Sequence, residues 1–244
     1  MMRMNSSFKQ NNSFESSIVC TKTSYNEIYF SGQIEHSSIS NLINTINSAD
    51  ETLYMFEDYV LKNYKEKLNL ESIDYDTLPI FLHFSSVGGD ADLAAFFINY
   101  VNSIKRPIII IASSLVASAG VYIFLSFNKR YAFEKSYFML HDFLIDFPGF
   151  TKLTDIKTFV SQNEQILKLM FENDLAKKTL IKEKIKDDHY LSVNDAKELG
   201  FFERIITSIK ELEEYQNSLL YRNMFFEFYN TFLIGDLDKT QSMS

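Results

Sequence analysis

Two short segments of small residues stand directly after apolar runs, and each contains a serine. One is Ser86-Val87-Gly88-Gly89 and the other is Ala117-Ser118-Ala119-Gly120. Each is expected to open a helix, where backbone N–H groups are free and the dipole favours an anion. Ser118 could therefore attack a carbonyl, while the N–H of the next residue and another from the glycine pair hold the developing oxyanion. The alternative is that Ser118 is only a helix N-cap and Gly88-Gly89 only a turn.

A nucleophilic serine needs a base, and His141 is the first choice among the four histidines. It follows an apolar run at 137–140 and would emerge at a strand end, where the sites of α/β sheets gather. The weaker candidates lie within a strand, in a charged loop and at an exposed helix start: His83, His189 and His36, respectively. The lone Cys20 lies in an expected tail without a nearby histidine, so a cysteine nucleophile is not expected.

The base also needs a carboxylate that orients its ring. Spacing alone leaves four candidates open: Asp142, Asp146, Asp187 and Asp188.

The elements that must hold these residues alternate between strand and helix. Short apolar, β-branched runs predict strands at 27–30, 79–84, 108–111, 130–133, 137–140 and 205–206, with turns at 31–32 and 85–89. Apolar residues three and four apart predict helices at 38–49, early in 51–78, at 90–104, from 118, at 155–175, at 194–199 and within 207–244. The alternation predicts an α/β fold with a mainly parallel sheet.

Composition narrows the classes of protein. The chain has 244 residues and a formal net charge of −8, which argues against a nucleic-acid surface. A single cysteine excludes an internal disulfide framework and a multi-cysteine zinc site, and no metal or cofactor is expected. The N-terminus lacks the apolar core of a secretory signal, and the uncharged stretch 107–127 divides into a strand and a helix, so no membrane contact is expected. These features favour the cytoplasm, or the stroma or matrix of an organelle.

Four motifs, in this order, resemble those of the ClpP serine peptidases, the proteolytic subunits of the Clp protease. The family's strand followed by Ser-Pro-Gly-Gly stands here as residues 80–89, and its Ala-Ser-Met-Gly as residues 117–120. Its strand ending in Met-Ile-His stands as residues 139–141. Its Asp followed by an aromatic residue and Leu-Ser resembles residues 188–192. Residues 28–34 are similar to the family's first strand and turn, so the resemblance covers about residues 27–207.

The resemblance implies a role for each matching residue. Ser118 is similar to the nucleophile, His141 to the general base and Asp188 to the orienting carboxylate. The backbone N–H groups of Gly89 and Ala119 are similar to those of the oxyanion hole. The implied protein is a serine endopeptidase that hydrolyses unfolded proteins or peptides and needs no cofactor of its own.

The resemblance also implies an architecture and partners. The expected fold is that of the ClpP and crotonase families, with mainly parallel sheets, flanking helices and a protruding long helix at 155–175. That helix would join two stacked heptameric rings, and an ATP-driven AAA+ unfoldase would feed substrate into their chamber. The chain would then divide into a flexible tail at 1–25, a peptidase domain at 26–207 and a helical extension with a polar tail at 208–244.

The sequence departs from the family at points that keep other functions open. Val87 replaces the family's proline, Asp142-Phe143 replaces Gln-Pro, and residues 146–150 carry one glycine where the family has a glycine-rich strand. Residues 51–76 and 207–244 are longer than the family's pattern. One alternative is a catalytically silent ring subunit that acts in assembly. Another is a crotonase-type acyl-CoA enzyme, which shares the fold and a two-N–H oxyanion hole but does not need the three side chains.

Overall fold

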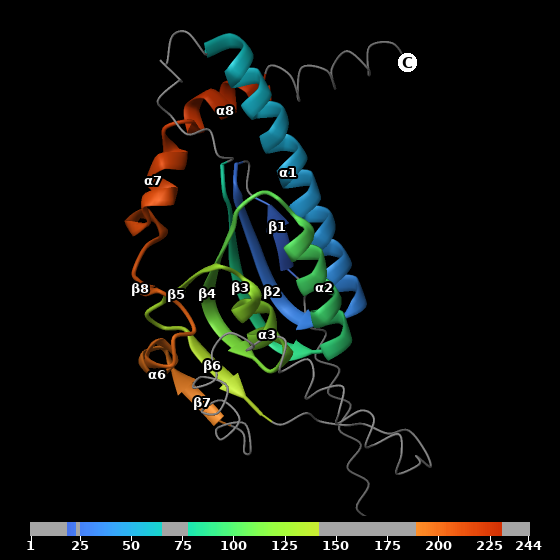
Figure 1. Ribbon diagram of the computed structural model, residues 1–244, viewed down its shortest axis with the longest axis vertical. Helices are drawn as coiled ribbons and strands as arrows, with labels where there is room; N and C mark the ends of the chain where they lie inside the picture. Colours follow the sequence, from blue (N-terminus) through green and yellow to red (C-terminus); the bar gives the residue numbers. More distant parts are fainter. Residues whose placement is uncertain (1–18, 23–24, 65–77, 142–188, 231–244) are drawn as a thin grey trace, which may run out of the picture.

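The computed structural model describes residues 19–22, 25–64, 78–141 and 189–230 (Figure 1). Within these ranges the strands form one eight-stranded sheet in the order β1-β2-β3-β4-β5-β8, with β6 paired to β4 and to β7. The strands are β1 Val19–Lys22, β2 Glu27–Ile34, β3 Ile80–Gly89, β4 Ile108–Ala117, β5 Lys129–Phe133, β6 Tyr137–Leu140, β7 His189–Ser192 and β8 Arg204–Ile206. The helices are α1 His36–Tyr64, α2 Ala91–Ser103, α3 Ala119–Ser126, α6 Val193–Glu198, η1 Ile209–Glu211, α7 Glu213–Leu219 and α8 Arg222–Phe228.

Most of the sheet is parallel. Strands β2, β3, β4, β5 and β8 pair in parallel, and β6 is parallel to β4. Strand β1 is antiparallel to β2, and β7 is antiparallel to β6. Helices α1, α2 and α3 form the crossovers that parallel neighbours require. The prediction of a mainly parallel α/β fold is therefore confirmed.

Alternate positions of β3 and β4 divide the core between the two faces of the sheet. Ile80, Leu82 and Phe84 are buried in the larger cluster, together with residues of α1, α2 and α3. Phe81 and Ile109 belong to a smaller cluster that residues of α7 complete. Figure 1 shows α1 and α2 on one side of the sheet and α7 on the other. Since both faces are covered, the central strands appear in the sequence as continuous apolar runs.

Helix α1 is one continuous element, although the sequence predicted a helix at 38–49 and a second one after it. Leu42, Ile46, Leu53, Phe56 and Val60 are all buried. Their spacing of three, four and seven residues places them on one side of a single helix. This stripe crosses the predicted boundary near residue 50, so packing against the sheet keeps the helix intact.

The first and last described segments of the chain contribute more to the structure than the sequence predicted. Residues 19–22 pair with β2, so the expectation of a flexible tail is wrong for this stretch. Tyr25 is buried, and its hydroxyl donates to the carbonyl of Ser218, 193 positions further along the chain. The expected extension is helical as far as it is described, but Phe225 and Phe228 pack in the main core, on Phe56.

Two predicted turns are instead continuations of strands. Strand β2 runs through 31–32 to Ile34, and β3 runs through 85–89, because the two strands keep pairing as far as Ile34 and Gly89. The long helix expected at 155–175 lies outside the described residues. Among the described helices, none combines the length and the apolar character needed to cross a bilayer.

Candidate active site

Ser118 occupies the junction between β4 and α3. Its φ is 53° and its ψ is −125°. Within the described ranges it is the one non-glycine residue with a positive φ. Such a conformation costs about 1–3 kcal/mol and gives the sharp strand-to-helix turn that exposes a nucleophile. Ser118 stands at the N-cap position of α3, as the alternative expected, but its side chain makes no capping hydrogen bond.

Backbone hydrogen bonds fix Ser118 to the strand that leads to His141. The Ser118 N–H donates to the carbonyl of Met139 at 2.9 Å, and Ala117 is the register partner of Met139. Strand β6 ends at Leu140, so His141 follows directly at its carboxyl end. Ser118 and His141 thus leave adjacent parallel strands at the same edge of the sheet, as the sequence predicted.

Asp188, the predicted orienting carboxylate, lies outside the described residues. The three other aspartates that spacing left open also lie outside them, namely Asp142, Asp146 and Asp187. His189, the neighbour of Asp188, however, begins β7 and is the register partner of Leu140. The expectation of a charged loop at His189 is therefore wrong. The short segment His189–Ser192 is held as a strand by pairing with β6, a long-range contact that local sequence does not reveal.

Of the two glycines of the first motif, Gly88 lies against Ser118 and Gly89 lies against Ile34 of β2. A Cβ atom placed on Gly88 would stand 2.6 Å from the Cβ of Ser118 and 3.1 Å from its Oγ. A Cβ on Gly89 would stand 2.3 Å from the carbonyl oxygen of Ile34. Both glycines have positive φ, at 90° and 144°. The two motifs, about thirty positions apart, therefore meet as the sequence predicted, and only glycine permits this approach of β3 to Ser118.

Ala119 completes this group as the first residue of α3. It is buried, and the next residue, Gly120, brings the helix so close to β3 that a Cβ atom placed on it would stand 3.0 Å from the Cβ of Ser86. The first N–H groups of a helix have no partner within the helix. The junction thus brings the Ser118 hydroxyl and the start of a helix to one point.

The other described histidines have different surroundings. His83 is buried within β3, where its Nε2 lies 3.3 Å from Oε2 of Glu27 and its ring stacks on Tyr29 at 4.2 Å between centroids. The hydrogen bond with His83 is the main cause that lowers the pKa of the Glu27 carboxyl, with further bonds from Tyr29 and Tyr215. His36 is exposed at the first position of α1. Neither histidine belongs to the junction around Ser118.

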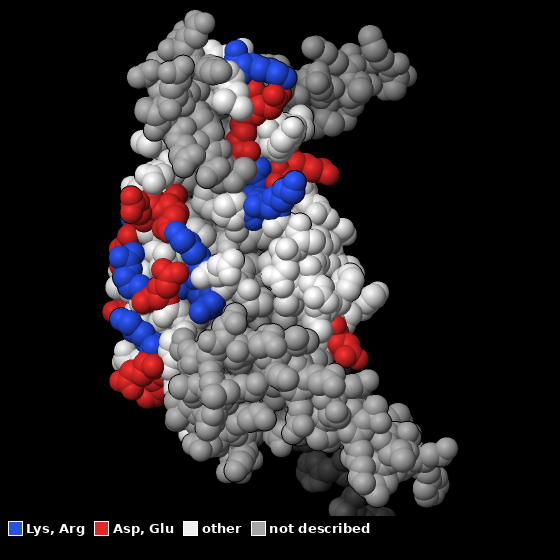
Figure 2. All heavy atoms as spheres, viewed as in Figure 1, with Lys and Arg blue, Asp and Glu red and all other residues white. Residues whose placement is uncertain are grey.

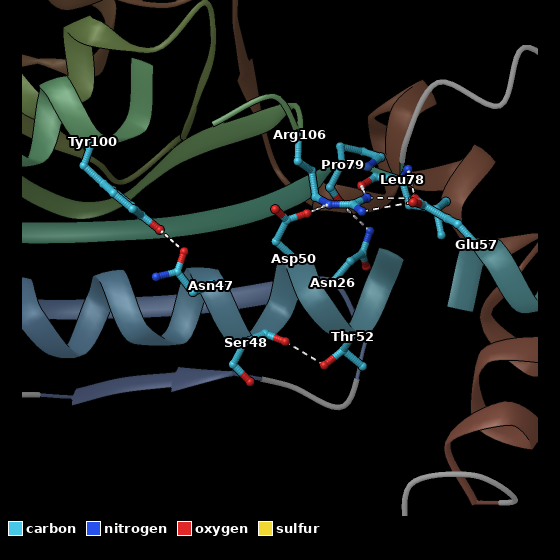
Figure 3. A network of polar contacts seen from close by, with 10 residues as sticks. All are labelled: Asn26, Asn47, Ser48, Asp50, Thr52, Glu57, Leu78, Pro79, Tyr100 and Arg106. Carbon is cyan, nitrogen blue, oxygen red and sulfur yellow. Dashed lines mark hydrogen bonds and ion pairs between the residues drawn. The ribbon is translucent and has the colours of Figure 1, made fainter. Parts of the chain in front are cut away.

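A buried arginine network, which the sequence did not reveal, lies at the opposite ends of β3 and β4 (Figure 3). The Arg106 side chain is 2% exposed and donates to Asp50, to both oxygens of Glu57 at 2.7 and 3.0 Å, and to the carbonyl of Leu78. It ties α1 to the segments that enter both strands. The one available signal was a charged residue just before the apolar run that starts at Pro107.

A cavity of about 930 Å³ adjoins this network. Its walls come from α1, the C-terminal end of α2, the start of β4 and helix α7, and they include Phe56, Val60, Val101 and Lys105. Figure 2 shows charged side chains along the α7 side and near the end of α1, whereas the surface over α2 carries few of them. Helix α2 has a single charged residue, Asp92, and an exposed Phe96.

Comparison with known proteins identifies the family of this chain. The model of the Clp protease family matches residues 57–209, which is more than half of the chain. The chain belongs to the Clp protease family, so the predicted resemblance is confirmed and a crotonase-type acyl-CoA enzyme is not supported.

The individual relatives are proteins of the same family. The chain is 30% identical over 164 residues to an ATP-dependent Clp protease proteolytic subunit 2 of Borreliella burgdorferi, covering 64% of this chain and 81% of the relative. It is 27% identical over 157 residues to a protein of the same name from Treponema denticola, covering 63% and 78%. A solved structure, that of a ClpP1 point mutant from Listeria monocytogenes, shares the fold with a TM-score of 0.56 at 23% identity, covering 76% of this chain and 93% of that one.

Proposed function

We propose that this chain is a proteolytic subunit that cleaves peptide bonds with Ser118 as nucleophile, His141 as general base and Asp188 as orienting carboxylate. The observation that carries the proposal is the strained Ser118, which makes no capping hydrogen bond, touches Gly88 and is fixed to the strand that leads to His141. Asp188 is supported by the pairing of its neighbour His189 with Leu140, the residue before His141.

In the proposed reaction the Ser118 Oγ attacks the peptide carbonyl while His141 removes its proton. The N–H groups of Gly89 and Ala119 stabilise the oxygen of the tetrahedral intermediate, and Asp188 holds the imidazole in the required tautomer. His141 then gives the proton to the leaving amine, which departs and leaves an acyl-enzyme. Water, activated by His141, hydrolyses this ester and restores the serine.

The wider proposal is an oligomeric chamber supplied by an ATP-driven unfoldase, in the cytoplasm or an organellar matrix. The relatives are named as subunits of ATP-dependent proteases, which supports it. The outer surface of α2 beyond its first turn, which carries no charged residue after Asp92 and exposes Phe96, also supports contact with another subunit, since apolar surface is stabilised by burial. Heptameric rings remain part of this proposal.

A second candidate is a catalytically silent ring subunit. It is favoured by Val87, whose side chain is 61% exposed at the bend beside Ser118, where the family has proline. The change lies one residue before Gly88, which packs on Ser118.

Labelling by a fluorophosphonate probe, together with hydrolysis of a short fluorogenic peptide, tests the proposal. Ser118→Ala should lose labelling and lower kcat by about 10⁴-fold or more. Ser114→Ala, an exposed serine on the same strand, is the matched control and should keep both activities. Labelling that persists in Ser118→Ala would place the nucleophile elsewhere, and a wild-type chain that is neither labelled nor active would favour the silent subunit.

A further inference from the structure

Ser86 is a buried serine next to the junction that has no role in the proposed reaction. It lies near the carboxyl end of β3 and is 2% exposed. Its Oγ accepts a hydrogen bond from the N–H of Gly88 at 3.1 Å. Donor and acceptor are two positions apart, so this bond closes a tight local bend of the chain. A buried polar group among small and apolar neighbours calls for a physical reason.

The bend coincides with an irregularity in the sheet. Strand β3 pairs with β2 as far as Ser86 opposite Gly32, and the next pair is Gly88 opposite Gln33. Val87 is thus the extra residue of a β-bulge, which is consistent with its exposed side chain. The Ser86 hydroxyl bridges this bulge, because it bonds the residue on the far side of Val87.

Ser86 also packs on the helix that begins after Ser118. A Cβ atom placed on Gly120 would lie 3.0 Å from the Cβ and 3.4 Å from the Oγ of Ser86. On the other side of the bulge, Gly88 packs directly on Ser118. Ser86 therefore contacts both the first turn of α3 and the bulge, and it fixes the separation between them.

We propose that Ser86 is a positioning residue that holds the β3 bulge, and with it the N–H of Gly89, at the correct distance from Ser118. The inference rests on the proposed function, because the Gly89 N–H that Ser86 would position is one of the two proposed oxyanion donors. Donors stabilise a developing charge only when they are held within a fraction of an ångström of its position. Ser86 acts through the backbone at Gly88 and Gly89 and does not touch the substrate.

The adjacent Ser85 offers a matched control. Its Oγ donates to the carbonyl of Leu115 in β4 at 3.2 Å, so it bonds a neighbouring strand and not the bulge. Replacing either serine by alanine removes one hydroxyl from the same strand. Only the change at Ser86 leaves the N–H of Gly88 without its acceptor.

The test measures hydrolysis of a fluorogenic peptide and inhibition by a peptide boronate, whose tetrahedral adduct occupies the oxyanion site. Full-length Ser86→Ala should lower kcat by about 10- to 100-fold, leave KM within about twofold and weaken boronate inhibition by a similar factor. Ser86→Cys, with a weaker acceptor, should fall between Ser86→Ala and wild type. Ser85→Ala should behave as wild type in both assays.

Equal kinetics in Ser86→Ala and Ser85→Ala would overturn the positioning role and leave the proposed triad untouched. A wild-type chain without peptide hydrolysis would overturn both proposals. If thermal unfolding shows that Ser86→Ala does not fold, Ser86→Cys carries the test. A Ser86→Cys chain with wild-type kcat and boronate affinity would then refute the inference.

Discussion

The two ends of β3 and β4 are built in opposite ways. At their amino ends the buried Arg106 is fixed by Asp50, Glu57 and the carbonyl of Leu78 (Figure 3). At their carboxyl ends small residues meet, and the backbone of Ser118 stays in a strained conformation without a side-chain cap. Strain of this kind persists only where the surrounding structure over-determines it. The difference separates an end that is held by paired charges from an end where close backbone packing holds a strained residue.

The largest expected effect is at the carboxyl ends. Gly88→Ala places a methyl group against Ser118 at a φ of 90°. It should lower kcat/KM by about 10³-fold, because it displaces Ser118 and the adjacent Gly89 N–H from each other. Peptide hydrolysis measures the loss. Gly200→Ala, at a φ of 73° after α6, adds backbone strain alone and should lower the melting temperature but keep kcat/KM. Equal losses of activity in both variants would contradict the special position of Gly88.

The next effect belongs to the amino ends. Arg106→Met leaves two carboxylates without their guanidinium partner and should lower the free energy of unfolding by about 3 kcal/mol. Urea unfolding measures this value, and the activity of the folded fraction should not change. Arg204→Met, which removes an exposed side chain from β8 and its hydrogen bond to the carbonyl of Glu211, should change the unfolding free energy by less than about 1 kcal/mol. A loss of activity without a loss of stability in Arg106→Met would remove the contrast between the two ends.

A smaller effect tests whether Ser118 is strained. Glycine adopts positive φ without penalty, whereas alanine does not, so Ser118→Gly should be more stable than Ser118→Ala by about 1 kcal/mol. Both variants lack the nucleophile, so the comparison isolates the backbone. Equal melting temperatures for the two variants would mean that the backbone at residue 118 relaxes.

The smallest effect concerns the start of β2. Hydrogen bonds from His83, Tyr29 and Tyr215 lower the pKa of Glu27 from its ordinary value of 4.5. Because the folded pKa is the lower one, this stabilisation is present above pH 4.5 and is lost as the pH falls through the folded pKa. Glu27→Gln should therefore lose less stability than wild type on acidification, as measured by thermal unfolding between about pH 3 and 7. The exposed Glu134→Gln should keep the wild-type profile, and an identical profile for Glu27→Gln would refute the assignment.

Much of the architecture followed from the sequence because it depends on local patterns. The isoleucine run at 108–111 predicted a buried strand, and apolar spacing predicted α2, whose N-cap Asp90 binds the N–H groups of Asp92 and Leu93. The junction at Ser118 was predictable for the same reason. Small residues that directly follow a buried strand mark a place where the backbone must turn sharply.

Other elements depend on contacts between distant residues and could not be predicted. Strands β1 and β7 are four residues long and gain stability from pairing with β2 and β6. The partners of Arg106 come from α1, about fifty positions earlier, and no local spacing selects them. The carboxylate was chosen by resemblance alone, and its place in the site stays a prediction.

The C-terminal helices have a consequence for the order in which the newly made chain acquires its structure. Tyr25 bonds Ser218, Glu27 accepts from Tyr215, and Phe56 packs on Phe225. The C-terminal partners are made long after Tyr25, Glu27 and Phe56, so the groups that they cover stay exposed to water and to chaperones during most of the synthesis of this region. Translation that stops near residue 207 would release a chain whose Phe56 and Phe81 have lost their covering residues. Quality control should remove such a product.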